Sequence, residues 1–313
     1  MSWWTNYWFR PAPLIDLAVV RIVAVLTQLI MLARSYNWMV SHVALTPPEW
    51  FVPLPIFHLL TLPFGAAYLP TVEVLQVVWI VTLVAGTLAL IGLLTNLSLM
   101  VFAVGSVLWQ SAIYSFGDFH HPEAVMMITL GVLALSPAGA TLSLDRLLRD
   151  RRAPKHALPS ALLRETSRFA GWPILTVQWI FVLMYLSAVS HKLIFTGTHW
   201  LNGYTLQAKL IQDGLRWGSP LALMLAQYHI LVYVLQFFTI LFQATFALAV
   251  LFPRLRWLYV PLGLGFHIGI LLTLRAPFYQ WMALYVVFIP WSRVFERVGQ
   301  YLGERSAVAA AKG

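Results

Sequence analysis

Residues 185–206 read YLSAVSHKLIFTGTHWLNGYTL, and this stretch contains the clearest change of character in the chain. An apolar run that begins near Pro173 ends there with His191 and Lys192. The glycine, the His-Trp pair and the Asn-Gly-Tyr that follow are typical of a turn rather than of a lipid-facing helix. A lysine at the edge of a bilayer span either extends to water or lies in a site shielded by protein. The residues alone leave both alternatives open.

The composition around this stretch indicates an integral membrane protein. Apolar residues make up 60% of the chain and charged residues only 10%, whereas soluble domains contain about a quarter charged residues. The apolar runs are long and show no alternation with period two, so we expect them to cross the bilayer as helices rather than as barrel strands. Residues 14–32 lack the small-residue cleavage site of a signal peptide and are expected to form a retained first span.

The absence of cysteine and the excess of positive charge limit the classes of enzyme and of partner that the chain could represent. With no cysteine, the chain has no structural disulfide and no thiol-based mechanism, which excludes membrane oxidoreductases that couple a cysteine pair to a quinone. The formal net charge of +9 is accounted for by charge asymmetry between loops. We therefore expect the lipid bilayer, and no nucleic acid, as a partner.

The apolar runs predict an all-α polytopic bundle of about eight transmembrane helices. The expected spans cover residues 14–33, 72–94, 97–115, 122–136, 173–191, 229–252, 257–274 and 278–295. Long connections are expected at about 34–72, 137–171 and 192–228, the last with a short surface helix over 220–226. One transmembrane domain would occupy residues 1–296, and a polar, Ala-rich tail over 297–313 is expected to be disordered.

Positive charges predict the orientation of this bundle. The connection over 137–171 carries seven Lys and Arg residues, and both ends of the chain add further arginines. By the positive-inside rule, this connection and both termini are cytoplasmic. The opposite, extracytoplasmic face would then carry His120, His121, His191, Lys192, His199 and Trp200. His267 lies part-way into the seventh expected span, from which it could reach the same cavity.

Helix geometry gives Lys192 a chemical role. Tyr185, Ala188 and Val189 share its helix face, and the small residues Ser187 and Ser190 would allow another helix to approach closely. Packing in protein would remove water from the ammonium group and favour the neutral amine. A neutral amine can take a proton from a weak acid, so Lys192 is a candidate general base.

The other polar residues of the spans have both functional and structural interpretations. His120 and His121 could form an ordinary turn at the start of a helix, capped by Asp118. His267, flanked by glycines, is either a functional residue or a partner in a hydrogen bond between helices. No spacing of histidines and carboxylates predicts a metal site.

Two further polar features of the spans are interpreted as structural. Gln236 and Gln243 are seven residues apart and therefore share one helix face, where we expect hydrogen bonds between helices. Arg21 is expected to pair with Asp16 or with a backbone carbonyl.

Three stretches resemble the transmembrane domain of vitamin K-dependent gamma-carboxylases and their bacterial relatives, the horizontally transferred transmembrane domain (HTTM) family. AVSHKLIFTGTHWLNGYTL (188–206) resembles the family's segment with a basic pair, a tryptophan and Gly-Tyr. DFHHPEAVMMITLGVLALSPAGATLSLD (118–145) resembles its histidine-led span with a Ser-Leu-Asp exit. GFHIGILLTLRAPFYQWMALYVVFIPW (265–291) resembles its Phe-His helix and aromatic last span. Together they mark out the region from the fourth to the eighth expected span, which is more than half of the chain.

The resemblance implies a reaction and a set of site residues. In the carboxylases the lysine of this motif deprotonates a reduced quinone, vitamin K, whose oxygenation yields a strong base that takes a proton from glutamate. Lys192 would be the general base, His121 would stabilise the developing oxyanion, and His267 matches the Phe-His position. The cavity would also include His120, His191, His199, Trp200, Tyr204 and Arg275. The implied location is the bacterial inner (plasma) membrane, with the site on the extracytoplasmic side.

This sequence departs from the carboxylase pattern in two respects. The carboxylases have two adjacent lysines where this chain has His191 and Lys192, and they continue into a large lumenal region that binds the protein substrate. Glutamate carboxylation is therefore not the expected reaction, unless a peptide or partner protein supplies the lumenal part. We expect an enzyme acting on a quinol or a similar lipophilic acid. The alternative is a non-catalytic protein that uses the same cavity for lipid or peptide binding, maturation or export.

Overall fold

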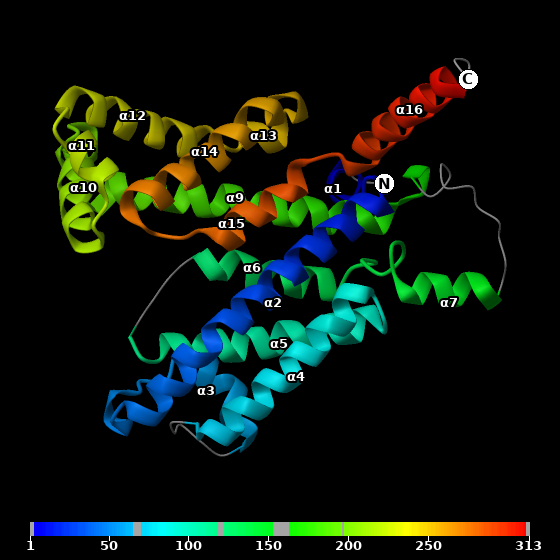
Figure 1. Cartoon of the computed structure of the whole chain (residues 1–313), viewed down its shortest axis with the longest axis horizontal. Helices are drawn as coiled ribbons and strands as arrows, with labels where there is room; N and C mark the ends of the chain where they lie inside the picture. The colour runs from blue at the N-terminus through cyan, green and yellow to red at the C-terminus, as the bar shows by residue number, and fades with distance from the viewer. Residues whose placement is uncertain (1–2, 65–69, 118–121, 153–162, 196, 311–313) are drawn as a thin grey trace. The chain divides into compact units, whose positions relative to one another are not determined.

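The computed structural model describes residues 3–64, 70–117, 122–152, 163–195 and 197–310. These residues are mostly helical, and they group into two compact units, which we describe separately (Figure 1). Unit 1 comprises Met1–Ile174 and Ile289–Gly313, and unit 2 comprises Leu175–Phe288. The single domain expected over residues 1–296 is thus built as two units, and helix α9, Arg168–Phe195, extends from the first into the second.

Unit 1 is built around one long helix and three helices that pack with it. Its main helices are α2 (Leu14–Leu45), α4 (Val72–Ile91), α5 (Thr95–Tyr114) and α6 (Pro122–Ala134). Shorter helices are α1 (Trp3–Trp8), η1 (Pro48–Trp50), α3 (Pro55–Thr61), η2 (Leu62–Phe64) and α7 (Leu144–Arg152). Strands β1 (Ala12–Pro13) and β2 (Thr166–Ser167) form a two-residue antiparallel pair, and α16 (Trp291–Ala310) completes the unit.

Unit 2 contains the remainder of α9 and the helices that follow it. These are η3 (Gly197–Leu201), α10 (Tyr204–Trp217), α11 (Pro220–Ala226), α12 (His229–Thr245) and α13 (Leu248–Leu251). They continue with η4 (Pro253–Leu255), α14 (Arg256–Leu274), α15 (Tyr279–Leu284) and η5 (Tyr285–Phe288). The short surface helix expected over 220–226 is confirmed as α11, which buries Ala222 and Ala226 and exposes Leu221 and Met224.

Five helices in the described part of the chain are long and apolar enough to cross a membrane. They are α2, α4, α5, α9 and the continuous η4–α14 segment, Pro253–Leu274. A sixth crossing is possible if α11 and α12, which meet at a bend of 104°, form one span. The chain is therefore helical with the character of a membrane protein, but the residues that the structure describes do not form all eight expected crossings as membrane-length helices.

Two of the expected spans and the expected tail differ in the structure. α6 has only 13 residues, too few for an upright crossing, which needs about 20. The span expected over 278–295 is interrupted after Phe288, because Pro290 cannot continue a helix and instead starts α16 by accepting bonds from the N–H groups of Arg293 and Val294. Residues 297–310, expected to be disordered, continue α16 to Ala310.

The first helix is also longer than expected. α2 runs to Leu45, although the sequence suggested an end near residue 33. No proline interrupts residues 34–45, and the helix ends just before Pro47 and Pro48, which disfavour helical conformation in the residue before them.

Buried polar side chains fix the segment that joins α6 to α7. Arg21 of α2 is fully buried and donates from Nη1 to the carbonyl of Ala138, at 2.9 Å, and from Nη2 to that of Leu142, at 2.6 Å. The backbone-carbonyl alternative for Arg21 is therefore confirmed. Asn96 donates to the carbonyls of Ala134 and Ser136, at 2.8 Å each, and so caps the C-terminus of α6.

Asp145 caps the neighbouring helix. Its carboxylate accepts bonds from the N–H of Leu94, at 2.9 Å, from the N–H of Thr95, at 2.8 Å, and from the Thr95 hydroxyl, at 2.6 Å, at the start of α5. Partial burial opposes ionisation, but the bonds from Thr95 and Leu94 outweigh it and lower the pKa of Asp145 below its usual value. The Ser-Leu-Asp exit noted in the sequence is thus a helix-capping device.

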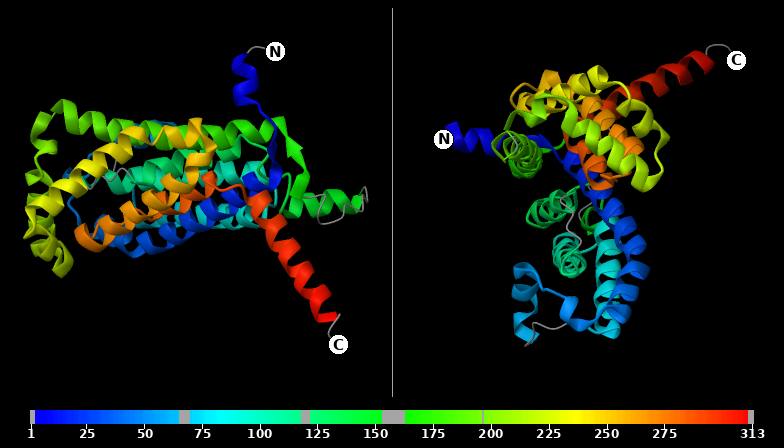
Figure 2. Two further views of the ribbon diagram at one scale, coloured as in Figure 1. Left: turned by 90° about the horizontal axis from the view of Figure 1, so that it is seen from above. Right: turned by 90° about the vertical axis from the view of Figure 1, so that its left-hand side faces the viewer.

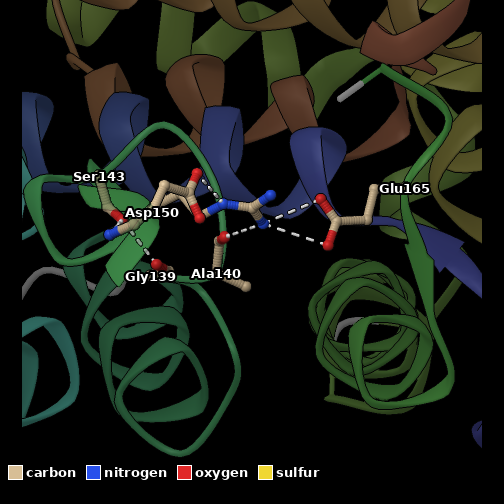
Figure 3. Close-up of polar contacts among 6 residues, drawn as sticks. Gly139, Ala140, Ser143, Asp150 and Glu165 are labelled. Carbon is tan, nitrogen blue, oxygen red and sulfur yellow. Dashed lines mark hydrogen bonds and ion pairs between the residues drawn. The ribbon is translucent and has the colours of Figure 1, made fainter. Parts of the chain in front are cut away.

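Arg146, the next residue, connects α7 to the segment before α9 (Figure 3). Its Nε lies 2.7 Å from Asp150, and its Nη1 lies 2.9 Å from Glu165. Figure 3 shows the carboxylates of Asp150 and Glu165 on opposite sides of the guanidinium group. The backbone carbonyl of Glu165 in turn accepts a bond from the N–H of Leu14, at 3.0 Å. The basic connection is therefore tied to the start of α2.

Candidate functional site

Lys192 lies near the C-terminal end of α9 and is only partly exposed. Its ammonium nitrogen donates a hydrogen bond to Oε1 of Gln243, at 2.7 Å. The same nitrogen lies 5.1 Å from the centre of the Trp200 ring, which is within the range of a cation–π contact. Lys192 is thus held by protein groups on two sides rather than extending freely into the surroundings.

Helix α12 supplies the acceptor for this lysine. Gln243 is 5% exposed, and Gln236, on the same helix face, is 1% exposed. Oε1 of Gln236 accepts a bond from the N–H of Leu206, at 2.9 Å, near the start of α10. The predicted role of both glutamines as hydrogen-bond partners between helices is confirmed, and Gln243 additionally joins the site through Lys192.

Tyr185 lies on the same face of α9, seven residues before Lys192. Its hydroxyl group is hydrogen-bonded to Nε2 of His267 at 2.8 Å and to the hydroxyl of Tyr285 at 2.6 Å. All three side chains are at most 2% exposed. Helices α9 and α14 and the segment η5 therefore meet at one buried cluster, which we call the Tyr-His-Tyr triad.

Gly263 makes the triad possible. The Tyr285 hydroxyl occupies the space where a Cβ atom on Gly263 would stand, so any larger residue there would displace it. Gly265 and Gly269, which also flank His267 in the sequence, have nothing within 4 Å of an added Cβ atom. Only the first of these three glycines is required by packing around the triad.

Aromatic rings enclose the triad. Trp281 lies 5.0 Å from the Tyr185 ring and 5.4 Å from the His267 ring, measured between centroids. Phe246 lies 4.7 Å from Tyr185 on another side. This shell excludes water, so the hydrogen bonds within the triad act at low dielectric and leave little freedom for the His267 ring.

The buried face of α9 connects the triad with the lysine. Tyr185 is 2% exposed and Val189 is 7% exposed, whereas Leu186, Ser187 and Ser190 are exposed. The predicted face of Tyr185, Val189 and Lys192 is confirmed. The suggestion that Ser187 and Ser190 allow a helix to approach is wrong, because both point away from the packed side. A separation of seven residues corresponds to about 10 Å along a helix.

Three other residues predicted for the cavity are exposed to the surroundings of the protein. His191 is exposed, with its ring 4.8 Å from that of Phe195. His199 is also exposed, and it contributes its backbone carbonyl, which accepts a bond from the Thr205 hydroxyl at 2.8 Å. Arg275 is exposed at the end of α14, where it adopts a positive φ of 55°. Trp200, by contrast, contacts Lys192.

Tyr204 lies on α10 and is 63% exposed. Its ring stacks on that of His229 with 4.2 Å between centroids, and Nδ1 of His229 lies 2.9 Å from Oε1 of Gln207. His229 was not predicted as part of the site. His120 and His121 lie outside the described residues, so the proposed role of His121 is not represented in the geometry.

The described residues contain no group of three or more His, Cys, Asp or Glu side chains that could hold a metal ion. The polar groups gathered in unit 2 are instead an amine, amides, phenols and an imidazole. Such groups exchange protons and hydrogen bonds, which makes acid–base chemistry the natural capability of this arrangement.

Sequence reasoning did not assign a role to Gln243 in the site or to Tyr285 in the triad. The spacing of Gln236 and Gln243 was a usable signal, because two amides on one face of an apolar helix need partners. No comparable signal marked Tyr285. Its hydroxyl reaches the triad only because Gly263 has no side chain at the position that the hydroxyl occupies.

Comparisons with protein-family models, curated proteins and solved structures gave no match for this chain. The function is therefore argued from the site itself.

Proposed function

We propose that the chain is a membrane enzyme, similar in chemistry to the vitamin K-dependent gamma-carboxylases, in which Lys192 acts as a general base toward a quinol or a similar lipophilic acid. The observation that carries the proposal is the 2.7 Å bond between the Lys192 nitrogen and the buried amide oxygen of Gln243. The amide oxygen of Gln243 is neutral, so it can accept this bond from either the ammonium ion or the neutral amine of Lys192.

The apolar surface next to Lys192 supports a lipophilic substrate. Ile194 and Phe195 are each 74% exposed, and Leu193 is 39% exposed. In a membrane-length helix such side chains face acyl chains. A ligand reaching Lys192 across this surface would be one that partitions into the bilayer.

The chemistry requires only the transfer of a proton. The hydroxyl of the bound acid gives its proton to the nitrogen of Lys192, which leaves an ammonium ion on the enzyme and an oxyanion on the substrate. Gln243 orients the amine, and the Trp200 ring stabilises the ammonium ion that forms. A reduced quinone of the vitamin K type would supply a weakly acidic hydroxyl and the electrons for any later oxidation.

His267 fits a supporting role within this proposal. The triad fixes the imidazole of His267, which belongs to α14, to Tyr185 on the face of α9 that also carries Lys192. We propose that His267 acts through Tyr185 in ordering this face. The extracytoplasmic orientation of the site and its location in the plasma membrane are part of the same proposal, and they rest on the distribution of positive charge.

A non-catalytic role in lipid or peptide handling is the second candidate, because the exposed apolar residues beside Lys192 would suit a binding surface equally well. Substitution of Lys192 separates the two. The test is the rate at which dissolved oxygen oxidises a reduced naphthoquinone in the presence of the purified protein in lipid nanodiscs, because a quinol anion is oxidised faster than the neutral quinol. The enzyme predicts near-complete loss with both Lys192→Ala and Lys192→Arg, since arginine does not deprotonate. A binding protein predicts retained ligand affinity and no turnover in any variant.

Lys209→Arg is the matched control for this experiment. Lys209 is half exposed on α10 and pairs with Asp213 at 3.2 Å, outside the contacts of Lys192 described above. Its substitution should leave turnover unchanged. Equal turnover in the wild-type protein and in Lys192→Ala, with normal folding, would overturn the proposed function.

A further inference from the structure

Helix α16 begins where a membrane-length helix ends. The N–H of Ser292 donates to the carboxylate of Asp16 at 2.7 Å, and Asp16 lies in the first turn of α2. Figure 2 shows α16 leaving this end of α2 at a steep angle. α2 is one of the candidate spans, so a bilayer that α2 crosses would have one of its surfaces near the start of α16.

A second contact fixes the first turns of α16. Nε of Arg164 lies 3.1 Å from the carboxylate of Glu296, and the Arg164 side chain is 76% exposed. Together with the Asp16–Ser292 bond, this ion pair gives the first turns of α16 a defined rotation about the helix axis.

With this rotation, α16 exposes an apolar stripe. Trp291, Phe295 and Val298 follow the spacing of one helix face. Phe295 is 36% exposed and Val298 is 50% exposed. The rings of Trp291 and Phe295 lie 5.9 Å apart and form a continuous surface.

The opposite face of α16 is polar and basic. Arg293, Arg297 and Gln300 are exposed there. Arginines of the central connection lie at the same end of unit 1, because Arg168 donates to the carbonyl of Phe9 at 3.4 Å and Glu165 bonds Leu14. The apolar stripe therefore lies beside a concentration of positive charge.

We infer that α16 docks in the headgroup layer of a bilayer rich in anionic lipid, with Phe295 and Val298 inserted and Arg293 and Arg297 against the phosphates. Amphipathic helices with an aromatic-aliphatic stripe and a basic polar face bind such surfaces through apolar burial and charge attraction together. The position of Ser292 at the end of α2 supplies the geometric reason, since it starts the helix at that depth.

The test uses the full chain, which has no cysteine of its own, so that a single introduced cysteine carries the only label. Val298→Cys probes the apolar stripe and Gln300→Cys, two residues away, probes the polar face. Each is labelled with an environment-sensitive fluorophore and reconstituted in nanodiscs of phosphatidylcholine with or without phosphatidylglycerol. We expect blue-shifted emission and quenching by lipid-borne nitroxides at position 298 but not at 300, more strongly with phosphatidylglycerol.

Charge removal completes the test. Arg293→Gln with Arg297→Gln should weaken docking by about 25-fold, because each basic residue near an anionic surface contributes roughly a factor of five. Equal emission at positions 298 and 300 in both lipid mixtures would overturn the inference. Burial at 298 that depends on protein concentration but not on phosphatidylglycerol would also overturn it, in favour of contact with a second copy.

Discussion

The nitrogen of Lys192 and the side-chain oxygen of Gln243 are 2.7 Å apart and join helices α9 and α12. The acceptor of this bond is a neutral amide that is 5% exposed. The choice of an amide over a carboxylate matters, because a carboxylate would favour the protonated lysine, and an amide can hold the amine in either protonation state.

Gln243→Glu tests this choice directly. The new carboxylate would pair with Lys192 and keep it protonated, so the fold should persist while proton removal from substrate is lost. We expect quinol turnover to fall by about 100-fold or more, the usual contribution of a general base. Turnover is measured on protein whose thermal unfolding matches the wild type. Full activity in a folded Gln243→Glu protein would refute the role of Lys192 as the base.

Gly263→Ala should destabilise unit 2, because the added methyl group would occupy the position of the Tyr285 hydroxyl. Forcing an extra methyl group into a packed core costs about 1–3 kcal/mol. Gly265→Ala, on the same helix and with open space around it, is the matched control and should be neutral. The comparison is made by reversible unfolding in mixed micelles, and equal stability of the two variants would contradict the packing described for the triad.

Tyr185→Phe and Tyr285→Phe should differ in their cost. The Tyr185 hydroxyl bonds both His267 and Tyr285, so Tyr185→Phe removes two hydrogen bonds, whereas Tyr285→Phe removes one. Each lost bond at a buried site costs about 1–3 kcal/mol. We therefore expect the larger decrease in the free energy of unfolding for Tyr185→Phe. The reverse order would show that Tyr185 is not the centre of the triad.

The cap formed by Asp145 should make unit 1 sensitive to acid. Its pKa is lowered in the folded chain, so its stabilising effect is complete above the unfolded value of about 3.9 and is lost as the pH falls through the lower, folded value. Wild type and Asp145→Asn should differ in unfolding free energy by about 1 kcal/mol near pH 7, and by less below about pH 4. A difference that does not change with pH would contradict the cap.

The sequence predicted several helices well because local signals set their ends. Residues 257–274 form α14 almost as expected, and the proline and turn residues around α11 gave its bounds. Helix α10 was missed because its mixed polar and apolar residues lacked the length and hydropathy of a span. The last span was wrong because the apolar run continues through Pro290, where the backbone cannot.

The candidate site also has one part that the sequence could predict and one part that it could not. The shared face of Tyr185 and Lys192 follows from helix periodicity, which the sequence carries. The partners of these residues do not, because Gln243 is 51 positions from Lys192 and Tyr285 is 100 positions from Tyr185. Such contacts depend on how helices pack, and one sequence contains no local signal for that packing.

The most direct test of the account is the absorption spectrum of a reduced naphthoquinone bound to the purified protein without oxygen. Deprotonation by Lys192 predicts the red-shifted spectrum of the quinol anion in the wild-type protein and in Lys209→Met, and its loss in Lys192→Met. A bound quinol with the same neutral spectrum in all three proteins, or no binding at all, would contradict the claim that Lys192 is a base toward a lipophilic acid.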